Sequence, residues 1–407
     1  MNYSRRQALL QIGKYALSSL VLNQAGAEFL NARTPRWEWK DWHMVLSDIH
    51  VHPVLDKWIQ SSPWGKQYPL IFKAVSKMLN KTSLDWERCH DTGVNMLCVA
   101  HFNPFDEFAS MPTDPNPDAP RQTIRMLDVL EDEINENASG YAKIVNNAAE
   151  LKAALKIKPN DPGFRIAVVH TIEGGHALGG DLKALDKFAE RGVAMITITH
   201  FFTKAVGSSA NSLPFFPDHG APPPVQGLSN FGRDLIKRME ELGIIVDVAH
   251  ATSTTVTGIL ENSTRPLVAS HISARTLGDH PYSLYDEQIK EIADRGGIIG
   301  VILMPYWLSN YSNVHMSDKY GSLKDAVKTI RHICKICGTH ECIGIGSDFA
   351  GYIPGPKDMA RLSDIHKLRK LLLQEFDYDK KIVECIMARN VADFFINHWG
   401  VKGEDKR

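Results

Sequence analysis

The chain has 407 residues, of which 43% are hydrophobic and 23% are charged, a composition typical of a globular protein with a sizeable core. This length fits two or three average domains, or one large α/β barrel of about 250 residues or more. The 46 Lys and Arg residues nearly balance the 47 Asp and Glu residues, so the formal net charge is -1. Nucleic-acid-binding proteins usually carry a concentrated positive field. The composition therefore argues against a nucleic-acid partner.

The first 27 residues are predicted to be an export signal rather than part of the fold. Arg5 and Arg6 precede a modestly apolar stretch that ends near Leu22, and small residues suited to a signal peptidase follow it. The pattern resembles a twin-arginine signal, which the twin-arginine export machinery recognises. No stretch approaches the ~18 continuous apolar residues of a membrane span. We expect a periplasmic protein without a transmembrane anchor in its mature chain; a frayed cytosolic terminus is the alternative.

Residues 28–407 are predicted to form a single domain. Short apolar runs alternate there with longer helical patterns such as Asn230–Leu242 and Leu323–Ile336, and this alternation indicates parallel βαβ units. Eight runs are predicted to be strands: Met44–His50, Val94–His101, Ile166–Ile172, Ala194–Thr199, Ile244–Ala249, Leu267–Ser270, Gly297–Leu303 and Ile343–Ser347. Eight such units predict an α/β fold of the (β/α)8 or TIM-barrel type. A helical tail over Asp377–Trp399 is expected to cover the barrel.

Six cysteines are too few for a disulfide framework in a chain of this length. Cys334 and Cys337, with two histidines nearby, superficially resemble a zinc knuckle. The stretch fits better as the end of an amphipathic helix that turns at Gly338 into a strand. A disulfide between Cys334 and Cys337 after export stays open.

Residues that can bind a metal or carry a proton follow six of the eight predicted strands. His50 and His52 lie two positions apart, so in an extended strand both project from one face. The others follow the third, fourth, fifth, sixth and eighth strands: Glu173, His200, His250, His271 and Asp348. The active site of a (β/α)8 barrel lies at the carboxyl ends of its strands. Imidazoles with a carboxylate suit Zn²⁺, while Mn²⁺ and Fe²⁺ are compatible with the same ligand types.

Several segments resemble the membrane (renal) dipeptidases of peptidase family M19 and their bacterial relatives, metallopeptidases with amidohydrolase-like barrels. The resemblance covers nearly all of the chain after the signal. It rests on segments in the same order: Thr171–His176, Ile196–His200, Gly227–Gly232, Ile245–His250, Ala269–Arg275, Asp279–Pro281 and Gly344–Phe349.

The resemblance implies a site for two divalent metal ions, usually zinc. His50 and His52 would bind one ion, His250 and His271 would bind the other, and Glu173 would bridge them. Two ions at such a spacing can hold a bridging hydroxide that is nucleophilic at neutral pH.

The resemblance also implies the roles of two further residues. Asp348 would take the proton of the nucleophile and pass it to the leaving amine, while His200 would hydrogen-bond the oxyanion that develops. The expected activity is hydrolysis of a small peptide or amide bond, as by a dipeptidase. Relatives are often homodimers.

Two departures from the family pattern bear on this expectation. His52 stands where Asp is usual, so one anionic ligand is replaced by a neutral one. Tyr282 stands where the resemblance implies an Arg that clamps the carboxylate of a dipeptide, and a hydroxyl cannot replace a bidentate guanidinium. Arg275, in the same loop, is the alternative anchor.

Two other functions stay open at this stage. One is a tailoring enzyme that deacylates or isomerises an exported peptide or metabolite, because a blocked substrate needs no carboxylate clamp. The other is a non-catalytic binding protein on the same fold, which a failure of the predicted ligands to converge would favour.

Overall fold

The computed structural model describes residues 42–67, 69–70, 82–109, 115–202, 205–210, 227–308, 321–353, 355–377 and 379–402. The predicted export signal lies outside these described residues. Within them, no helix has both the length and the apolar character needed to cross a membrane.

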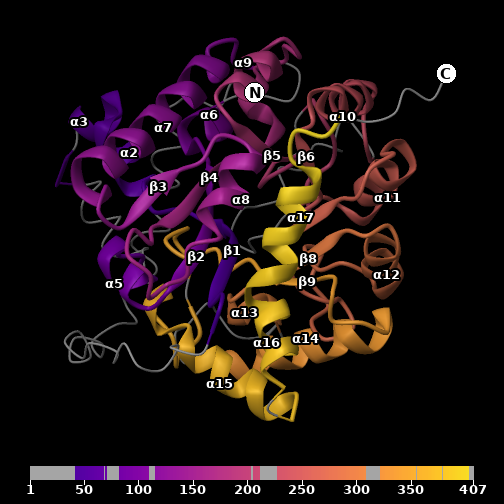
Figure 1. Ribbon diagram of the computed structural model, residues 1–407. Helices are drawn as coiled ribbons and strands as arrows, with labels where there is room; N and C mark the ends of the chain where they lie inside the picture. The colour runs from indigo at the N-terminus through magenta and orange to yellow at the C-terminus, as the bar shows by residue number, and fades with distance from the viewer. Residues whose placement is uncertain are drawn as a thin grey trace.

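A closed ring of eight parallel strands forms the centre of the molecule, with helices around it (Figure 1). The strands are β1 Leu46–Val51, β2 Val94–His101, β4 Ile166–Glu173, β5 Val193–Thr197, β6 Ile245–Asp247, β7 Val268–Ile272, β8 Ile298–Val301 and β9 Ile343–Ile345. Each pairs with its neighbour, β2 pairs with β4, and β9 pairs back with β1, which closes the ring. The predicted (β/α)8 barrel is therefore confirmed, and each of the eight predicted runs overlaps one barrel strand.

A ninth strand, β3 (Ala142–Ile144), was not predicted. It pairs with the amino-terminal half of β4, where Ala142 lies opposite Ile166, whereas β5 pairs with the carboxyl-terminal half. Three residues are too few to show a strand periodicity, which explains why the sequence pattern missed it.

Helices separate the strands and follow the last one, and two of them match the helical patterns predicted over 230–242 and 323–336. The helices are α2 Leu55–Ser61, α3 Pro63–Gln67, α5 Trp86–Asp91, α6 Pro104–Ala109, α7 Ala119–Glu133, α8 Ala148–Ala154, α9 Ala184–Glu190, α10 Asn230–Leu242, α11 Ser253–Asn262, α12 Asp286–Asp294, α13 Pro305–Leu308, α14 Leu323–Cys337, α15 His366–Glu375, α16 Lys380–Glu384 and α17 Asn390–His398. α10 has the predicted bounds, because Ser229 caps its amino end by accepting from Gly232 N at 2.9 Å and Gly243, at φ 73°, ends it.

The cysteine-containing stretch is the end of α14, as predicted. Gly338 has φ 70° and terminates the helix after Cys337. All six cysteines are free thiols, and none belongs to a metal-binding cluster of the described residues.

The carboxyl-terminal helices cover the amino-terminal end of the barrel. Ala388, Val391 and Phe395 pack in one core cluster with Ile49 and Met96, which project into the barrel. α17 crosses in front of the strands in Figure 1. The barrel is thus closed at this end, and its opposite end, where the strands finish, is left to hold the functional site.

Candidate metal centre

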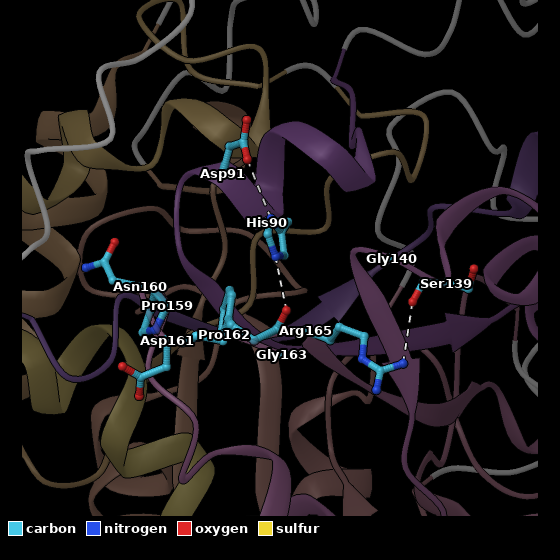
Figure 2. Close-up of a pocket in the computed structure, with 11 residues that line it drawn as sticks. His90, Asp91, Ser139, Gly140, Pro159, Asn160, Asp161, Pro162, Gly163 and Arg165 are labelled. Carbon is cyan, nitrogen blue, oxygen red and sulfur yellow. Dashed lines mark hydrogen bonds and ion pairs between the residues drawn. The ribbon is translucent and has the colours of Figure 1, made fainter.

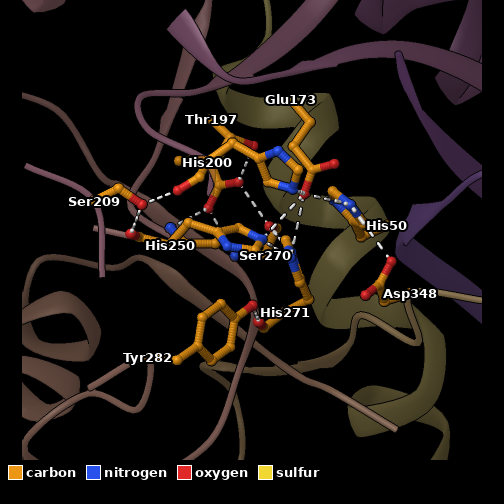
Figure 3. Close-up of polar contacts among 12 residues, drawn as sticks. His50, Glu173, Thr197, His200, Ser209, His250, Ser270, His271, Tyr282 and Asp348 are labelled. Atoms are coloured by element: carbon orange, nitrogen blue, oxygen red, sulfur yellow. Dashed lines mark hydrogen bonds and ion pairs between the residues drawn. The ribbon is translucent and has the colours of Figure 1, made fainter. Parts of the chain in front are cut away.

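The seven predicted ligand and proton-carrying residues lie together at the carboxyl ends of the strands. Figure 3 labels all of them except His52. Each of them is buried: His50, His52, Glu173, His200, His250, His271 and Asp348. They come from six strands or the turns that directly follow, as the barrel geometry requires.

The imidazoles of four predicted ligands converge on the Glu173 carboxylate, as does His200, whose Nε2 lies 3.5 Å from Glu173 Oε1. The Nε2 atoms of His50 and His250 each lie 3.2 Å from Glu173 Oε1. His271 Nε2 lies 3.5 Å from the same oxygen, and His52 Nε2 lies 3.5 Å from Oε2. One carboxylate oxygen faced by so many nitrogens is better explained as a shared metal ligand than as a hydrogen-bond acceptor.

The four histidines form two pairs. In the first half of the centre, His50 Nε2 and His52 Nε2 are 3.1 Å apart; in the second half, His250 Nε2 and His271 Nε2 are 2.9 Å apart. Ligands of a tetrahedral ion with bonds of about 2.0–2.1 Å are separated by roughly 3.3 Å. The donor atoms therefore fit a divalent ion in each half.

Asp348 lies beside the first half. Its Oδ1 is 3.3 Å from His52 Nε2 and 4.0 Å from His50 Nε2. Asp348 and His250 both have left-handed backbone conformations, with φ of 58° and 63°, which are costly for residues other than glycine. The Asp348 amide donates to His50 O at 2.9 Å and helps to hold this conformation.

Three overlapping groups of donors lie close enough to hold an ion. They are His50 with His52 and Asp348, His50 with Glu173 and His271, and Glu173 with His200 and His250. Asp348 and His200 thus have the reach of ligands as well as of proton carriers.

Buried charge sets the protonation states in the centre. Burial raises the pKa of Glu173, but the positive potential of His200 and His50 and hydrogen bonds from His250 outweigh it, so the pKa lies well below its usual value. Burial opposes the charged form of His50, yet Glu173 and Asp348 raise the pKa of His50 to about 9. Burial and the neighbouring His50 lower the pKa of His271 well below its usual value. The surroundings therefore favour the charged form of His50 and the neutral form of His271.

His200 is held by a carboxylate that the sequence analysis missed. His200 Nδ1 donates to Glu107 Oε2 at 2.6 Å, and Glu107 is 1% exposed. The His200 ring lies against Phe102 and Phe201, with centroid separations of 4.3 and 3.8 Å. Burial disfavours charge, but Glu107 and Glu173 raise the pKa of His200. Glu107 lies on α6 rather than at a strand end, so only the fold could bring it to His200.

Asp48 is a second buried carboxylate that the sequence did not reveal as part of the centre. Its Oδ1 accepts from His50 N at 3.1 Å and from Ser347 N at 2.9 Å, and so joins β1 to the end of β9. Burial raises the pKa of Asp48 to about 6. Asp247 has the corresponding place in β6, two residues before Ala249, whose amide donates to it at 3.1 Å.

The two predicted substrate-binding residues have different surroundings. The Tyr282 hydroxyl donates to His271 O, and its ring stacks on Trp307 at 4.1 Å and lies 4.8 Å from the His250 ring. Arg275 donates to Asp279 Oδ1 at 2.8 Å and lies over the Tyr285 ring. Tyr282 therefore adjoins the second half, with its only O–H used by the main chain, while Arg275 is engaged within its own loop.

A cavity of about 580 Å³ lies at the other end of the barrel (Figure 2). Its lining residues directly precede β2, β3 and β4, for example His90, Ser139 and Arg165. His90 Nε2 is 3.1 Å from Phe164 O, and Arg165 donates to Ser139 O at 3.5 Å. These polar groups connect the loops to one another and do not converge on a common point.

The barrel, its buried imidazoles and carboxylates and the family profile together define an amidohydrolase-like, metal-dependent hydrolase. The chain belongs to the membrane dipeptidase family, peptidase family M19, whose family profile matches residues 43–395.

Two similar proteins are named as dipeptidases, which is consistent with this family. The chain is 29% identical over 271 residues to an uncharacterised dipeptidase of Schizosaccharomyces pombe, covering 67% of this chain and 61% of the relative. It is 28% identical over 263 residues to the dipeptidase aclJ of Aspergillus oryzae, covering 63% and 56%. The matched part thus spans less than two thirds of the length of these relatives.

Solved structures share the fold. The dipeptidase AC, an M19 metallopeptidase, has a TM-score of 0.70 at 22% identity, covering 88% of this chain and 99% of that chain. A metallopeptidase from Rhodobacter sphaeroides, liganded with a phosphinate mimic of the dipeptide L-Ala-D-Ala, has a TM-score of 0.68 at 20% identity with the same coverage.

Proposed function

We propose that the protein is a metal-dependent hydrolase of small peptide or amide bonds, similar in activity to a dipeptidase. The convergence of five imidazole Nε2 atoms on the Glu173 carboxylate carries this proposal. The same convergence argues against a non-catalytic binding protein, because purely structural imidazoles would not need to share one acceptor.

The donor set suits two divalent ions, most simply Zn²⁺, since neutral imidazoles and a carboxylate are its usual ligands. His50 and His52 would hold one ion, His250 and His271 the other, and Glu173 would serve both. When bound, such ions supply Lewis acidity and lower the pKa of water at the site.

Asp348 is the residue placed to move a proton. It adjoins the first half, and its backbone is fixed by the bond from its amide to His50 O. A carboxylate there can accept a proton from the attacking water and return it to the leaving amine.

His200 is placed to stabilise negative charge on the substrate. Its Nδ1–H is fixed by Glu107, which orients the ring so that Nε2 faces the centre, 3.5 Å from Glu173 Oε1. A protonated Nε2 would donate to an oxyanion, and the Phe102 and Phe201 rings exclude water from that contact.

The test combines metal analysis with turnover of a dipeptide panel that includes D-residue and N-acylated members. Wild type is expected to bind metal and to hydrolyse at least one member in a metal-dependent way, and Asp348→Asn to lose turnover. If wild type binds metal but hydrolyses no member of the panel, the peptidase function is wrong.

A tailoring reaction on a blocked peptide or metabolite is the second candidate. It is favoured by Tyr282, whose hydroxyl proton is already used by His271 O and is not available to a substrate carboxylate. Under this candidate, Tyr282→Arg should raise activity on free dipeptides. No gain in that variant would contradict this explanation of specificity.

We also propose export by the twin-arginine route, on the strength of Arg5 and Arg6 before an apolar stretch. Replacing both with Lys should keep the protein in the cytoplasm of a bacterial host. Periplasmic recovery of that double variant would contradict this route.

A further inference from the structure

Asp247 is a fully buried carboxylate that lies behind the second half of the metal centre. Its Oδ1 accepts from two main-chain amides, those of Ala249 at 3.1 Å and Ser270 at 2.8 Å. Its Oδ2 accepts from two hydroxyls, those of Thr197 and Ser270, both at 2.6 Å. An ionised carboxylate can only accept, so the hydroxyl proton of Ser270 must point to Asp247.

The direction of that proton determines the next contact. Ser270 Oγ lies 2.7 Å from His271 Nδ1. Because Ser270 donates to Asp247, its oxygen must accept from His271, and the imidazole proton is placed on Nδ1. The lone pair of a neutral imidazole is then on Nε2, the atom that faces Glu173 and His250.

The first half has no corresponding support. Among the described residues, His50 Nδ1 and His52 Nδ1 are buried without a hydrogen-bond partner. Asp48 accepts from the main-chain amides of His50 and Ser347 rather than acting on an imidazole ring. The tautomers of the first pair are therefore not fixed by the protein in the way that the tautomer of His271 is.

We propose that Asp247 is a positioning residue that acts through Ser270 to hold His271 in its Nδ1–H tautomer, and so makes the second half the tighter of two metal positions. The inference rests on the metal centre of the proposed function. Partners that orient a ligand imidazole typically contribute about 10–100-fold to metal affinity.

Asp247→Asn tests the chain of contacts directly. The two main-chain amides need an acceptor, so the Asn carbonyl must face them and its NH₂ must replace Oδ2. That NH₂ would donate to Ser270 Oγ, whose proton would turn to His271 Nδ1 and displace the imidazole proton to Nε2. The ligand lone pair would be lost without a change in side-chain volume.

Two further variants complete the design. Ser270→Ala removes the link to His271 while leaving Asp247 in place, and serves if the Asn variant folds poorly. Thr197→Val is the matched control, because it removes the other hydroxyl bond to the same Oδ2 without a contact to His271.

Zinc affinity of metal-free protein is measured by competition with a chromophoric chelator. Wild type should give two dissociation constants. Asp247→Asn and Ser270→Ala should weaken the tighter one by about 10–100-fold, while Thr197→Val leaves both within about threefold. The inference, but not the proposed function, would be overturned if Thr197→Val weakened zinc binding as much as Asp247→Asn does. It would also be overturned if both zinc dissociation constants were unchanged in Asp247→Asn and Ser270→Ala. A wild type that binds no zinc would instead overturn the proposed function together with it.

Discussion

The two halves of the centre differ in how the protein supports them. In the second half, His271 Nδ1 contacts the Ser270 hydroxyl, which in turn donates to Asp247. In the first half, the Nδ1 atoms of His50 and His52 have no described partner, but His52 adjoins Asp348. Under the proposed two-ion centre, this comparison predicts that the second half holds its ion more tightly and that the first half lies next to the proposed proton carrier.

Glu173→Gln should have the largest effect, because this carboxylate is the only one in contact with all four histidines of the two halves among the described residues. We expect each zinc affinity to fall at least about 100-fold, since an amide is a poor ligand in place of a shared carboxylate. Metal analysis after dialysis measures this. Glu131→Gln, the same change outside the centre, is the control. Retention of two ions in Glu173→Gln would contradict the shared role.

Asp348→Asn should separate chemistry from metal binding. Loss of a proton carrier typically lowers kcat by about 10²–10⁴-fold. Zinc content should stay the same, because the other ligands of the first half remain. If the variant instead loses one ion with its activity, Asp348 is a ligand of the first half, as its distance to His52 also permits.

His52→Asp should act on the first half alone. It adds an anionic ligand where the protein has a neutral one, so we expect the weaker zinc constant to tighten by about tenfold. The tighter constant should stay within about threefold of wild type. The competition titration measures both. A change confined to the tighter constant would mean that the two halves have been assigned in reverse.

The smallest expected effect lies outside both halves, at Glu131. His170 Nε2 lies 3.4 Å from Glu131 Oε1, which also accepts from Arg191 at 2.7 Å. Against the opposing effect of burial, these neighbours lower the pKa of Glu131 to about 2. Because folding lowers this pKa, the Glu131 carboxylate stabilises the folded state at pH values above its unfolded-state pKa of about 4.5. That stabilisation is lost as the pH falls toward about 2. Glu131→Gln should cost less than about 1 kcal/mol, because the pair is partly exposed.

Urea unfolding at pH 6 and pH 3 measures the Glu131 effect. The gap between wild type and Glu131→Gln should be narrower at pH 3. A gap that widens at pH 3 would contradict the sign, and any change in zinc affinity would show that this carboxylate is not independent of the centre.

The barrel and the clustering of the candidate metal-binding residues at one end of it could be predicted because both follow from local patterns. Apolar runs mark the strands, and parallel strands bring the residues after them to one end. β3 could not be predicted, because its three residues are stabilised by pairing with β4 rather than by their own pattern. Glu107 lies 93 positions before His200 in the sequence, and nothing in the spacing joins them.

The support from Asp247 was hidden for a related reason. It depends on which hydrogen-bond donors the barrel places around one carboxylate, including Thr197 from the neighbouring strand β5. Near the end of β6, the amide of Ala249 donates to the Asp247 side chain rather than to a neighbouring strand. β6 therefore ends at Asp247, two residues before the predicted end at Ala249.

The most direct test of the central claim is a zinc titration of chelator-treated wild type, with the ions per chain counted at saturation. The division between the halves predicts two ions whose dissociation constants differ by at least about tenfold. A single ion per chain, or two ions of equal affinity, would contradict it.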